Sequence, residues 1–425
     1  MDDAEEAVPE SDVLPEPEPE PEPEDQHGLF ALLPLDVRVH ILSLIEGGDA
    51  AALLRTARTC RWMRDAVRAA TRRVHLTAGR RERLEALREE DRSAAVCGEA
   101  PPCGADLSRF SLFGFLQDCP ALEVLDLGQG AETGSSLDGG LAQPCVALRA
   151  LRAVGAGLRA DQCLCLSFTE FPALRALDLS RNAIGDRGLN VLLMTQQSVR
   201  RVERLVLQDC ELCGGVGNGT DCLLPACTHL DLSGNPISEL FANALPAVAP
   251  ALTTLMLGGC CEVTALDLSD CARLDKVSVK CMKALEELVL PPAQIITLDL
   301  VGLPQLCAEA ISTLLEQQHG DKLSSLLLAE SMADAPTVRT LREVFPALTN
   351  LDIRWCEQLG DAPEQALLGL LATEGAAPLS SLLCRCLPLI DDAVGAFVTT
   401  SAAGQAGCTL RQLDVGRYVA YNPAM

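Results

Sequence analysis

The chain has 425 residues, of which 48% are hydrophobic and only 3% aromatic, and its formal net charge is −25. Many aliphatic side chains with few rings suit thin repeated layers better than one thick core. The negative charge disfavours nucleic acid as a partner of the chain as a whole.

The cysteines and the apolar runs bear on location. Twenty cysteines and an N-terminus without a secretory leader favour a reduced protein of the cytoplasm and/or nucleus. The longest uncharged run, residues 240–261, contains Pro246 and Pro250 and fits the repeat pattern described below. We therefore expect this run to be core rather than a membrane span, and we expect no membrane partner.

The first segment, residues 1–28, is an acidic tail. Residues 1–26 carry twelve acidic residues and no lysine or arginine. Pro and Glu alternate over residues 9–24, so like charges repel and no apolar face can be buried. We expect a disordered, solvated tail, with contact to the arginine-rich helices that follow as the alternative.

Residues 29–76 are predicted to form a small unit of three helices. Pro34 suits a first helical position, and Val37 and Ile41 begin an apolar face at helical spacing. A Gly-Gly pair ends this helix, and Asp49 is a suitable N-cap for the next. So short a unit has a marginal core, which a partner or a neighbouring domain usually covers.

The same unit carries a stripe of arginines on one helix face: Arg58, Arg61, Arg64, Arg68 and Arg72. A solvated or tail-paired face is the favoured interpretation, and a phosphate-binding stripe is the alternative. Residues 77–118 follow as a connector, which is predicted to contain one short exposed helix and a loop.

From residue 119 the pattern L-x-x-L-x-L-x-x-[N/C] repeats. Clear copies are LEVLDLGQG (122–130), LRALDLSRN (174–182), VERLVLQDC (202–210), CTHLDLSGN (227–235), LTTLMLGGC (252–260), LTNLDIRWC (348–356) and LRQLDVGRY (410–418). In the L-x-L strand both leucines face the core and the residue between them faces solvent, while Asn or Cys turns the chain and bonds backbone groups along the stack. The pattern predicts an α/β fold, a curved leucine-rich-repeat solenoid over residues 119–425.

The spacing shortens between residues 257 and 300, where L-x-L pairs recur every ten or eleven residues. A coil needs about 20 residues, so we expect coils of 21–22 residues with strands on both sides. The predicted inner strands end at core positions 127, 153, 179, 207, 232, 257, 279, 300, 328, 353, 384 and 415, which gives about twelve coils. Positions 268 and 290 should face the outer side, where longer coils have room for helices, such as 310–318 and 365–371.

Catalytic and metal-binding patterns are weak. The five histidines lie outside Ser/His/Asp or HExxH contexts, and His229 is expected to be structural. GGVGNG at 214–219 lacks the Lys-Ser/Thr of a phosphate-binding loop. We therefore expect a non-catalytic protein without a cofactor or metal.

Four cysteines have the spacing C-x2-C-x8-C-x4-C: Cys210, Cys213, Cys222 and Cys227. This spacing permits a zinc site, but a structural role is favoured because Cys210 and Cys227 already occupy repeat positions. Cys260, Cys271 and Cys356 fit the same explanation, as ladder residues at the turns.

Aspartate stands between the two core positions in half of the predicted inner strands: Asp126, Asp178, Asp231, Asp299, Asp352 and Asp414. On the concave side these residues would form an acidic line. A solvated face is the favoured interpretation, and a basic protein target is the functional alternative. Trp355, beside Arg354, is the candidate aromatic anchor for the target, with packing at the turn as the alternative.

Residues 32–68 resemble an F-box. The matching features are Leu33-Pro34, Ile41-Leu42, the Asp49 helix start, Leu53-Leu54, and Cys60-Arg61 with Trp62 nearby. The repeats that follow contain C-x-x-L-G-D at 356–361 and L-x-x-I-D-D at 387–392. From residue 29 to 425 the chain is thus similar to the F-box/leucine-rich-repeat family. One departure is that Trp62 directly follows Arg61 instead of lying one residue later.

The resemblance implies a substrate receptor of a Skp–cullin–F-box ubiquitin ligase. The F-box would dock a Skp-type adaptor, and through it a cullin scaffold. The implied adaptor contacts are Leu33, Pro34, Val37, Ile41, Leu53, Leu54 and Trp62. The repeats would hold the target protein and bring its lysines near a charged ubiquitin carrier, so that the chain itself makes no bond.

Two other functions remain open. The array could be an interaction scaffold whose helical start only caps the first coil, which would bury Leu33, Ile41 and Leu54 against the repeats. A GTPase-activating leucine-rich-repeat protein would suit the acidic charge, although no motif points to it.

Overall fold

The computed structural model describes residues 73–75, 121–126, 145–161, 163, 171–194, 201–214, 223–292, 295–318, 321–359, 379–384 and 412–414. The chain forms two compact units, Met1–Ala70 and Thr71–Met425, and the described residues belong to the second. The predicted acidic tail, the F-box-like helices, the arginine stripe and the connector from residue 77 to 118 therefore lie outside the described residues.

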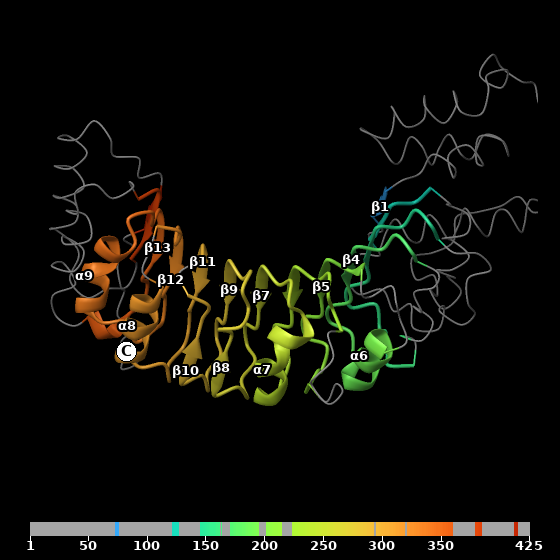
Figure 1. Cartoon of the computed structure of the whole chain (residues 1–425), viewed down its shortest axis with the longest axis horizontal. Coiled ribbons are helices and arrows are strands. Elements are labelled where there is room, and N and C mark those ends of the chain that lie inside the picture. Colours follow the sequence, from blue (N-terminus) through green and yellow to red (C-terminus); the bar gives the residue numbers. More distant parts are fainter. Residues whose placement is uncertain are drawn as a thin grey trace, which may run out of the picture. The chain divides into compact units, whose positions relative to one another are not determined.

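In its described ranges, the second unit is built on a parallel sheet of thirteen three-residue strands (Figure 1). In the order of the sheet they are β1 (Arg73–His75), β2 (Val124–Asp126), β3 (Ala150–Arg152), β4 (Ala176–Asp178), β5 (Arg204–Val206), β6 (His229–Asp231), β7 (Thr254–Met256), β9 (Lys276–Ser278), β11 (Thr297–Asp299), β12 (Ser325–Leu327), β13 (Asn350–Asp352), β14 (Ser381–Leu383) and β15 (Gln412–Asp414). Strand order follows chain order because each coil stacks on the one before it.

The twelve strands from β2 to β15 in this sheet confirm the predicted coils, because each ends one residue before a predicted core position. The repeat pattern did not predict β1, which pairs in parallel with β2. The short coils are also confirmed. β8 (Ala265–Asp267) and β10 (Glu287–Val289) form a separate two-stranded sheet on the outer side, as the positions 268 and 290 required.

The core lies behind the inner strands. In register, the middle residues of neighbouring strands stack directly on one another, as Leu151, Leu177 and Leu205 do, and all three are buried. The leucine after each strand, such as Leu179, is buried in the same cluster. The first and third residues of each strand point the other way, as the twofold side-chain alternation requires. We call the surface formed by these first and third residues the open face.

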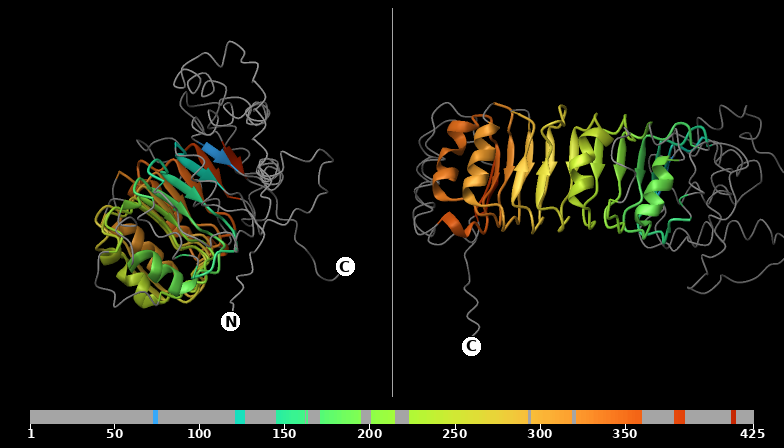
Figure 2. Two further views of the ribbon diagram at one scale, coloured as in Figure 1. Left: turned by 90° about the vertical axis from the view of Figure 1, so that its right-hand side faces the viewer. Right: turned by 60° about the horizontal axis from the view of Figure 1, so that its bottom comes forward.

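Among the residues that the structure describes, four helices of ten residues back the longer coils: α6 (Gly185–Met194), α7 (Glu239–Val248), α8 (Ala308–Gln317) and α9 (Ala335–Val344). They lie on the side of the sheet away from the open face (Figures 1 and 2). Ser238 caps α7 and Asp334 caps α9, each accepting a hydrogen bond from the backbone N–H three residues on. α8 confirms the predicted helix at 310–318, whereas the helix predicted at 365–371 lies outside the described residues.

Helices close both edges of the outer sheet. Glu239 of α7 accepts hydrogen bonds from the backbone N–H groups of Thr264 and Ala265, and Asn243 bonds the backbone of Ala265 and Asp267. On the other side, Gln318 at the end of α8 donates to the carbonyl of Pro291 just after β10. Side chains thus satisfy backbone groups that an exposed edge strand would leave open.

The uncharged run at 240–261 is divided between α7, which contains Pro246, and β7. Within the described ranges, we find no helix with the length and apolar character needed to cross a membrane.

Candidate protein-binding face

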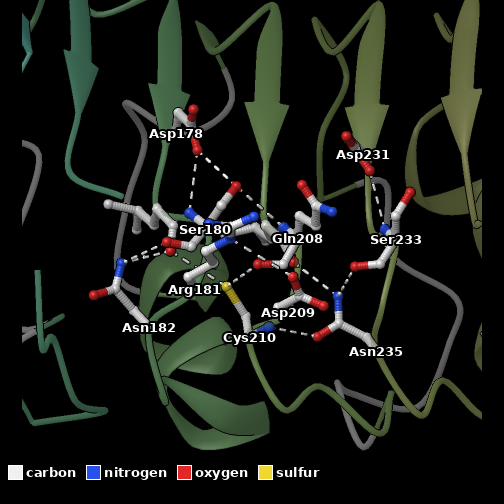
Figure 3. Close-up of polar contacts among 12 residues, drawn as sticks. Asp178, Ser180, Arg181, Asn182, Gln208, Asp209, Cys210, Asp231, Ser233 and Asn235 are labelled. Carbon is white, nitrogen blue, oxygen red and sulfur yellow. Dashed lines mark hydrogen bonds and ion pairs between the residues drawn. The ribbon is translucent and has the colours of Figure 1, made fainter. Parts of the chain in front are cut away.

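A ladder of polar side chains runs along the turns beneath the inner strands (Figure 3). Asn182 donates to the carbonyl oxygens of Ala153 and Leu179 at 2.8 and 2.6 Å, and its Oδ1 accepts from the N–H of Leu158. Asn235 repeats this arrangement two coils further on, bonding Leu207 and Cys210 of the preceding coil. The predicted role of asparagine in the ladder is confirmed, and it fixes the spacing of the strands.

Cysteine takes the ladder position in other coils. The thiols of Cys210, Cys260 and Cys356 lie 3.3, 3.5 and 3.0 Å from the carbonyl oxygens of Leu179, Leu232 and Leu328. Burial raises the pKa of Cys210 to about 11 and that of Cys260 to about 12. These thiols therefore stay protonated at neutral pH, as a donor to a carbonyl must be.

Of the cysteine set considered for zinc, Cys210 is the ladder residue described above. The Cys227 thiol donates to the carbonyl of His229 at 3.3 Å, and burial raises its pKa to about 11. Cys213 is exposed, and Cys222 lies outside the described residues. No group of three or more candidate metal ligands occurs in the part of the chain that the structure describes.

Trp355 belongs to a row of turn residues with positive φ. In nine consecutive coils the residue before the ladder position has φ between 52° and 76°: Gly155, Arg181, Asp209, Gly234, Gly259, Cys281, Gly302, Glu330 and Trp355. For a tryptophan this backbone conformation is strained. Trp355 is 43% exposed, so the turn leaves the residue partly accessible to solvent.

The predicted aspartates do fall in one row of the open face. Backbone pairing puts Asp126, Asp178, Asp231, Asp299 and Asp352 in the third position of their strands, and the side chain of Asp414 lies outside the described residues. The five described aspartates each have a local role that the sequence pattern did not reveal. Asp178, Asp231, Asp299 and Asp352 accept a hydrogen bond from the backbone N–H two residues on, closing the turn after the strand.

The row is not a continuous acidic line, and in this respect the expectation was wrong. Arg152 occupies the same row between Asp126 and Asp178, and its guanidinium lies 3.3 and 3.2 Å from their carboxylates. Asp352 is buried and holds the Arg354 guanidinium with hydrogen bonds of 2.9 and 2.7 Å. The register between coils, which places Arg152 in the row, therefore offsets part of the acidic charge of Asp126 and Asp178.

His229, the first residue of β6, is half-buried on the open face in register with Arg204. Burial lowers its pKa, and the charges of Arg204 and Lys276 lower it further, against the opposite effect of Asp231. The imidazole is therefore neutral at neutral pH, which fits the expected structural role.

Several open-face residues were not singled out by the sequence pattern. Val206, Met256, Leu327 and Leu383 occupy the third position, where other strands carry aspartate. The sequence does contain a signal for these four residues, because their repeat copies have an apolar residue in place of aspartate between the two core positions. The predicted adaptor contacts, Leu33, Pro34, Val37, Ile41, Leu53, Leu54 and Trp62, all lie outside the described residues.

Comparison with known protein families gives a match within the repeats. The family model described as Leucine Rich repeat matches residues 172–193. No curated protein matches the chain. Among solved structures, the chain is similar to the functional domain of InlJ from Listeria monocytogenes, described as including a cysteine ladder, with 14% identity, a TM-score of 0.33, and coverage of 68% of this chain and 57% of that one.

A second similar structure is the plant peptide hormone receptor RGFR1 in complex with RGF2, with 16% identity, a TM-score of 0.33, and coverage of 64% of this chain and 45% of that one. The chain thus spans about half the length of each of these proteins. The repeat match, the stacked parallel strands and the asparagine and cysteine ladder together identify the described part of the chain as an α/β leucine-rich-repeat solenoid.

Proposed function

We propose that the chain is a non-catalytic substrate-recognition subunit of a Skp–cullin–F-box ubiquitin ligase, acting in the cytoplasm and/or nucleus. In this proposal the repeats bind the target protein and the F-box-like segment binds the adaptor. The observation that carries the protein-binding part is the open face, an uninterrupted row of parallel strands with the helices on the other side (Figure 2).

The ladder makes the open face a rigid surface. Because Asn182, Asn235, Cys210 and their equivalents tie each coil to its neighbour, the outward side chains are held in fixed rows. A preorganised surface loses little conformational entropy on binding, which favours affinity for a partner. Extended surfaces of this kind are what stacked-repeat proteins use for binding.

The proposed target-binding residues lie on the open face and at the turn that follows β13. Trp355 supplies an exposed aromatic ring beside Arg354, whose guanidinium is fixed by Asp352. Aromatic and arginine side chains are the residue types that most often dominate binding energy at interfaces. Asp126, Asp178, Asp231, Asp299 and Asp414 are proposed as rim contacts, because the described ones already serve the turns or Arg152.

The ligase part of the proposal rests on the resemblance of residues 32–68 to an F-box. There an apolar helix face containing Leu33, Val37 and Ile41 would enter a groove of the adaptor. No such groove-binding face is needed if the segment is a simple cap of the array.

The test is a pull-down with the tagged full chain, blotting for the Skp-type adaptor and cullin. A Leu33→Ala/Pro34→Ala variant should lose both partners while circular dichroism shows an unchanged fold. The acidic tail provides a matched control, since Leu14 and Pro15 form a second Leu-Pro pair, and Leu14→Ala/Pro15→Ala should bind as wild type does.

A folded wild-type protein that captures neither adaptor nor cullin would overturn the ligase proposal. The second candidate, an interaction scaffold with a helical cap, would then stand, because the open face supports it equally. In that case Leu33→Ala/Pro34→Ala should lower the unfolding midpoint, since a cap buries these side chains against the first coil.

A further inference from the structure

Two cysteines outside the ladder lie in neighbouring coils. Cys261 directly follows the ladder residue Cys260 after β7, and Cys281 comes one residue before the equivalent position, Met282, after β9. Cys261 and Cys281 are exposed, whereas Cys260 is buried. The packing that explains the ladder thiols therefore does not explain this pair.

The two cysteines meet at one stretch of backbone. β7 pairs in parallel with β9, and the N–H of Gly259 donates to the carbonyl of Lys280 at 2.8 Å, which brings Cys281 beside Gly259. The sulfur of Cys261 lies 3.3 Å from the carbonyl oxygen of Gly259 and 4.0 Å from that of Cys281. The Cys261 thiol thus bridges the gap between its own coil and the coil that carries Cys281.

The turn itself does not require a cysteine at position 281. Cys281 has a φ of 58°, in the left-handed region, and the same position is glycine in four other coils: Gly155, Gly234, Gly259 and Gly302. Glycine adopts this conformation without the strain that a Cβ atom causes. The Cys281 sulfur lies over Gly302, where an added methyl group would come within 3.4 Å of it. The missing side chain of Gly302 therefore leaves the thiol room to turn.

We propose that Cys261 and Cys281 form a reversible disulfide that joins the β7 and β9 coils. The Cys281 side chain turns from Gly302 towards the Cys261 sulfur, which already approaches the Cys281 backbone. A disulfide joins Cα atoms about 5.5–6 Å apart, and neighbouring strands lie about 4.8 Å apart, so the spacing of coils suits such a bridge. Both thiols lie outside the ladder, so the ladder is kept when the disulfide forms.

The oxidant in this proposal is glutathione disulfide. The thiolate of one cysteine attacks a sulfur of glutathione disulfide, which forms a mixed disulfide and releases one glutathione thiolate. The thiolate of the other cysteine then attacks the protein sulfur of the mixed disulfide and releases the second glutathione. Two protein thiols are oxidised, one glutathione disulfide is reduced to two glutathione thiols, and the two protein protons pass to them. Excess glutathione reverses both steps.

The disulfide would lock the block of short coils. It encloses the segment from Cys261 to Cys281, which contains β8, and it lies at the turn between the inner pair β7–β9 and the outer pair β8–β10. A cross-link of this kind restricts the unfolded chain and so stabilises the folded one. The resistance of these coils to opening would then follow the thiol–disulfide balance. This proposal does not depend on the ligase function.

The test equilibrates the folded full chain in buffers of rising glutathione disulfide to glutathione ratio, followed by alkylation and peptide mass spectrometry. Cleavage after lysine, arginine and glutamate leaves Cys281 in peptide 281–283, and Cys260 and Cys261 in peptide 240–262. We expect these two peptides to become linked as the ratio rises, and to separate again on reduction. The urea midpoint of the wild-type protein should rise on oxidation.

Cys261→Ser and Cys281→Gly should both abolish the link and the shift in midpoint. Cys281→Gly should fold, because glycine occupies this position in other coils. Cys307→Ser is the matched control, since Cys307 is exposed on the β11 coil, and it should behave as wild type. The proposal is overturned if peptide 281–283 stays unlinked or carries only glutathione, or if the link persists in Cys261→Ser, which would assign it to Cys260.

Discussion

Asparagine at the ladder position shows how a single residue determines the fit of two coils. Asn235 accepts from the N–H groups of Cys210 and Leu212, and donates to the carbonyls of Leu207 and Leu232. It is fully buried, so none of these backbone groups can turn to water if the side chain is removed.

Asn235→Ala should therefore lower the free energy of unfolding by about 2–4 kcal/mol, because several buried backbone groups lose their partner together. Asn235→Cys should cost less, since Cys210 and Cys260 show that a thiol in this position reaches a carbonyl. Urea denaturation followed by far-UV circular dichroism measures both. Equal losses for the two variants would show that carbonyl bonding contributes nothing.

The outer sheet shows how a helix-backed coil is joined to a coil with a strand on its outer side. Coils with a helix on the outside meet coils with a strand there, and Glu239 lies at the junction of α7 and β8. Hydrogen bonds from the Thr264 side chain and from the backbone of Ala265 and Thr264 lower the pKa of Glu239. The carboxylate is thus the bonded form, and it favours the folded state.

Because folding lowers the pKa of Glu239, its carboxylate stabilises the folded state fully at pH values above its ordinary pKa of 4.5. This stabilisation is lost as the pH falls through the folded-state pKa. The difference in unfolding free energy between wild type and Glu239→Gln should therefore be largest at neutral pH and shrink below pH 4.5. Thermal unfolding at a series of pH values measures it, with Glu287→Gln on β10 as a control. A difference that stays constant with pH would contradict the role of the charge.

At the scale of the whole molecule, the thiols report whether the coils open together. Burial raises the pKa of Cys210, Cys227 and Cys271 to about 11, whereas Cys261 and Cys281 are exposed. Only thiolates alkylate rapidly. In native protein, iodoacetamide should label the exposed cysteines first, and the buried ones should react only at the denaturant concentration of global unfolding. Peptide mass spectrometry gives the order, and early labelling of Cys210 would instead show local opening.

Much of this architecture could be predicted from the sequence, because leucine at fixed spacing both forms the strand and fills the core. The 21-residue coils could be predicted equally well, because a strand is the only element short enough for their outer side. β1 was missed because its sequence, Arg-Val-His, has no leucine repeat. The charge compensation by Arg152 was missed because it depends on register between coils, and the φ of Trp355 because it is a property of the backbone.

The way in which α7 and α8 close the outer sheet also bears on how such an array can change in length. Glu239 and Asn243 bond backbone groups of β8, and Gln318 bonds the carbonyl just after β10; backbone groups are present whatever the side chains of a coil. A whole short coil could therefore be duplicated or deleted between β8 and β10, and both closing helices would still find the same partners. Such an event would shift β12 to β15 relative to Arg152 by one strand spacing, about 4.8 Å. The block of short coils thus acts as an adjustable spacer between the two ends of the open face.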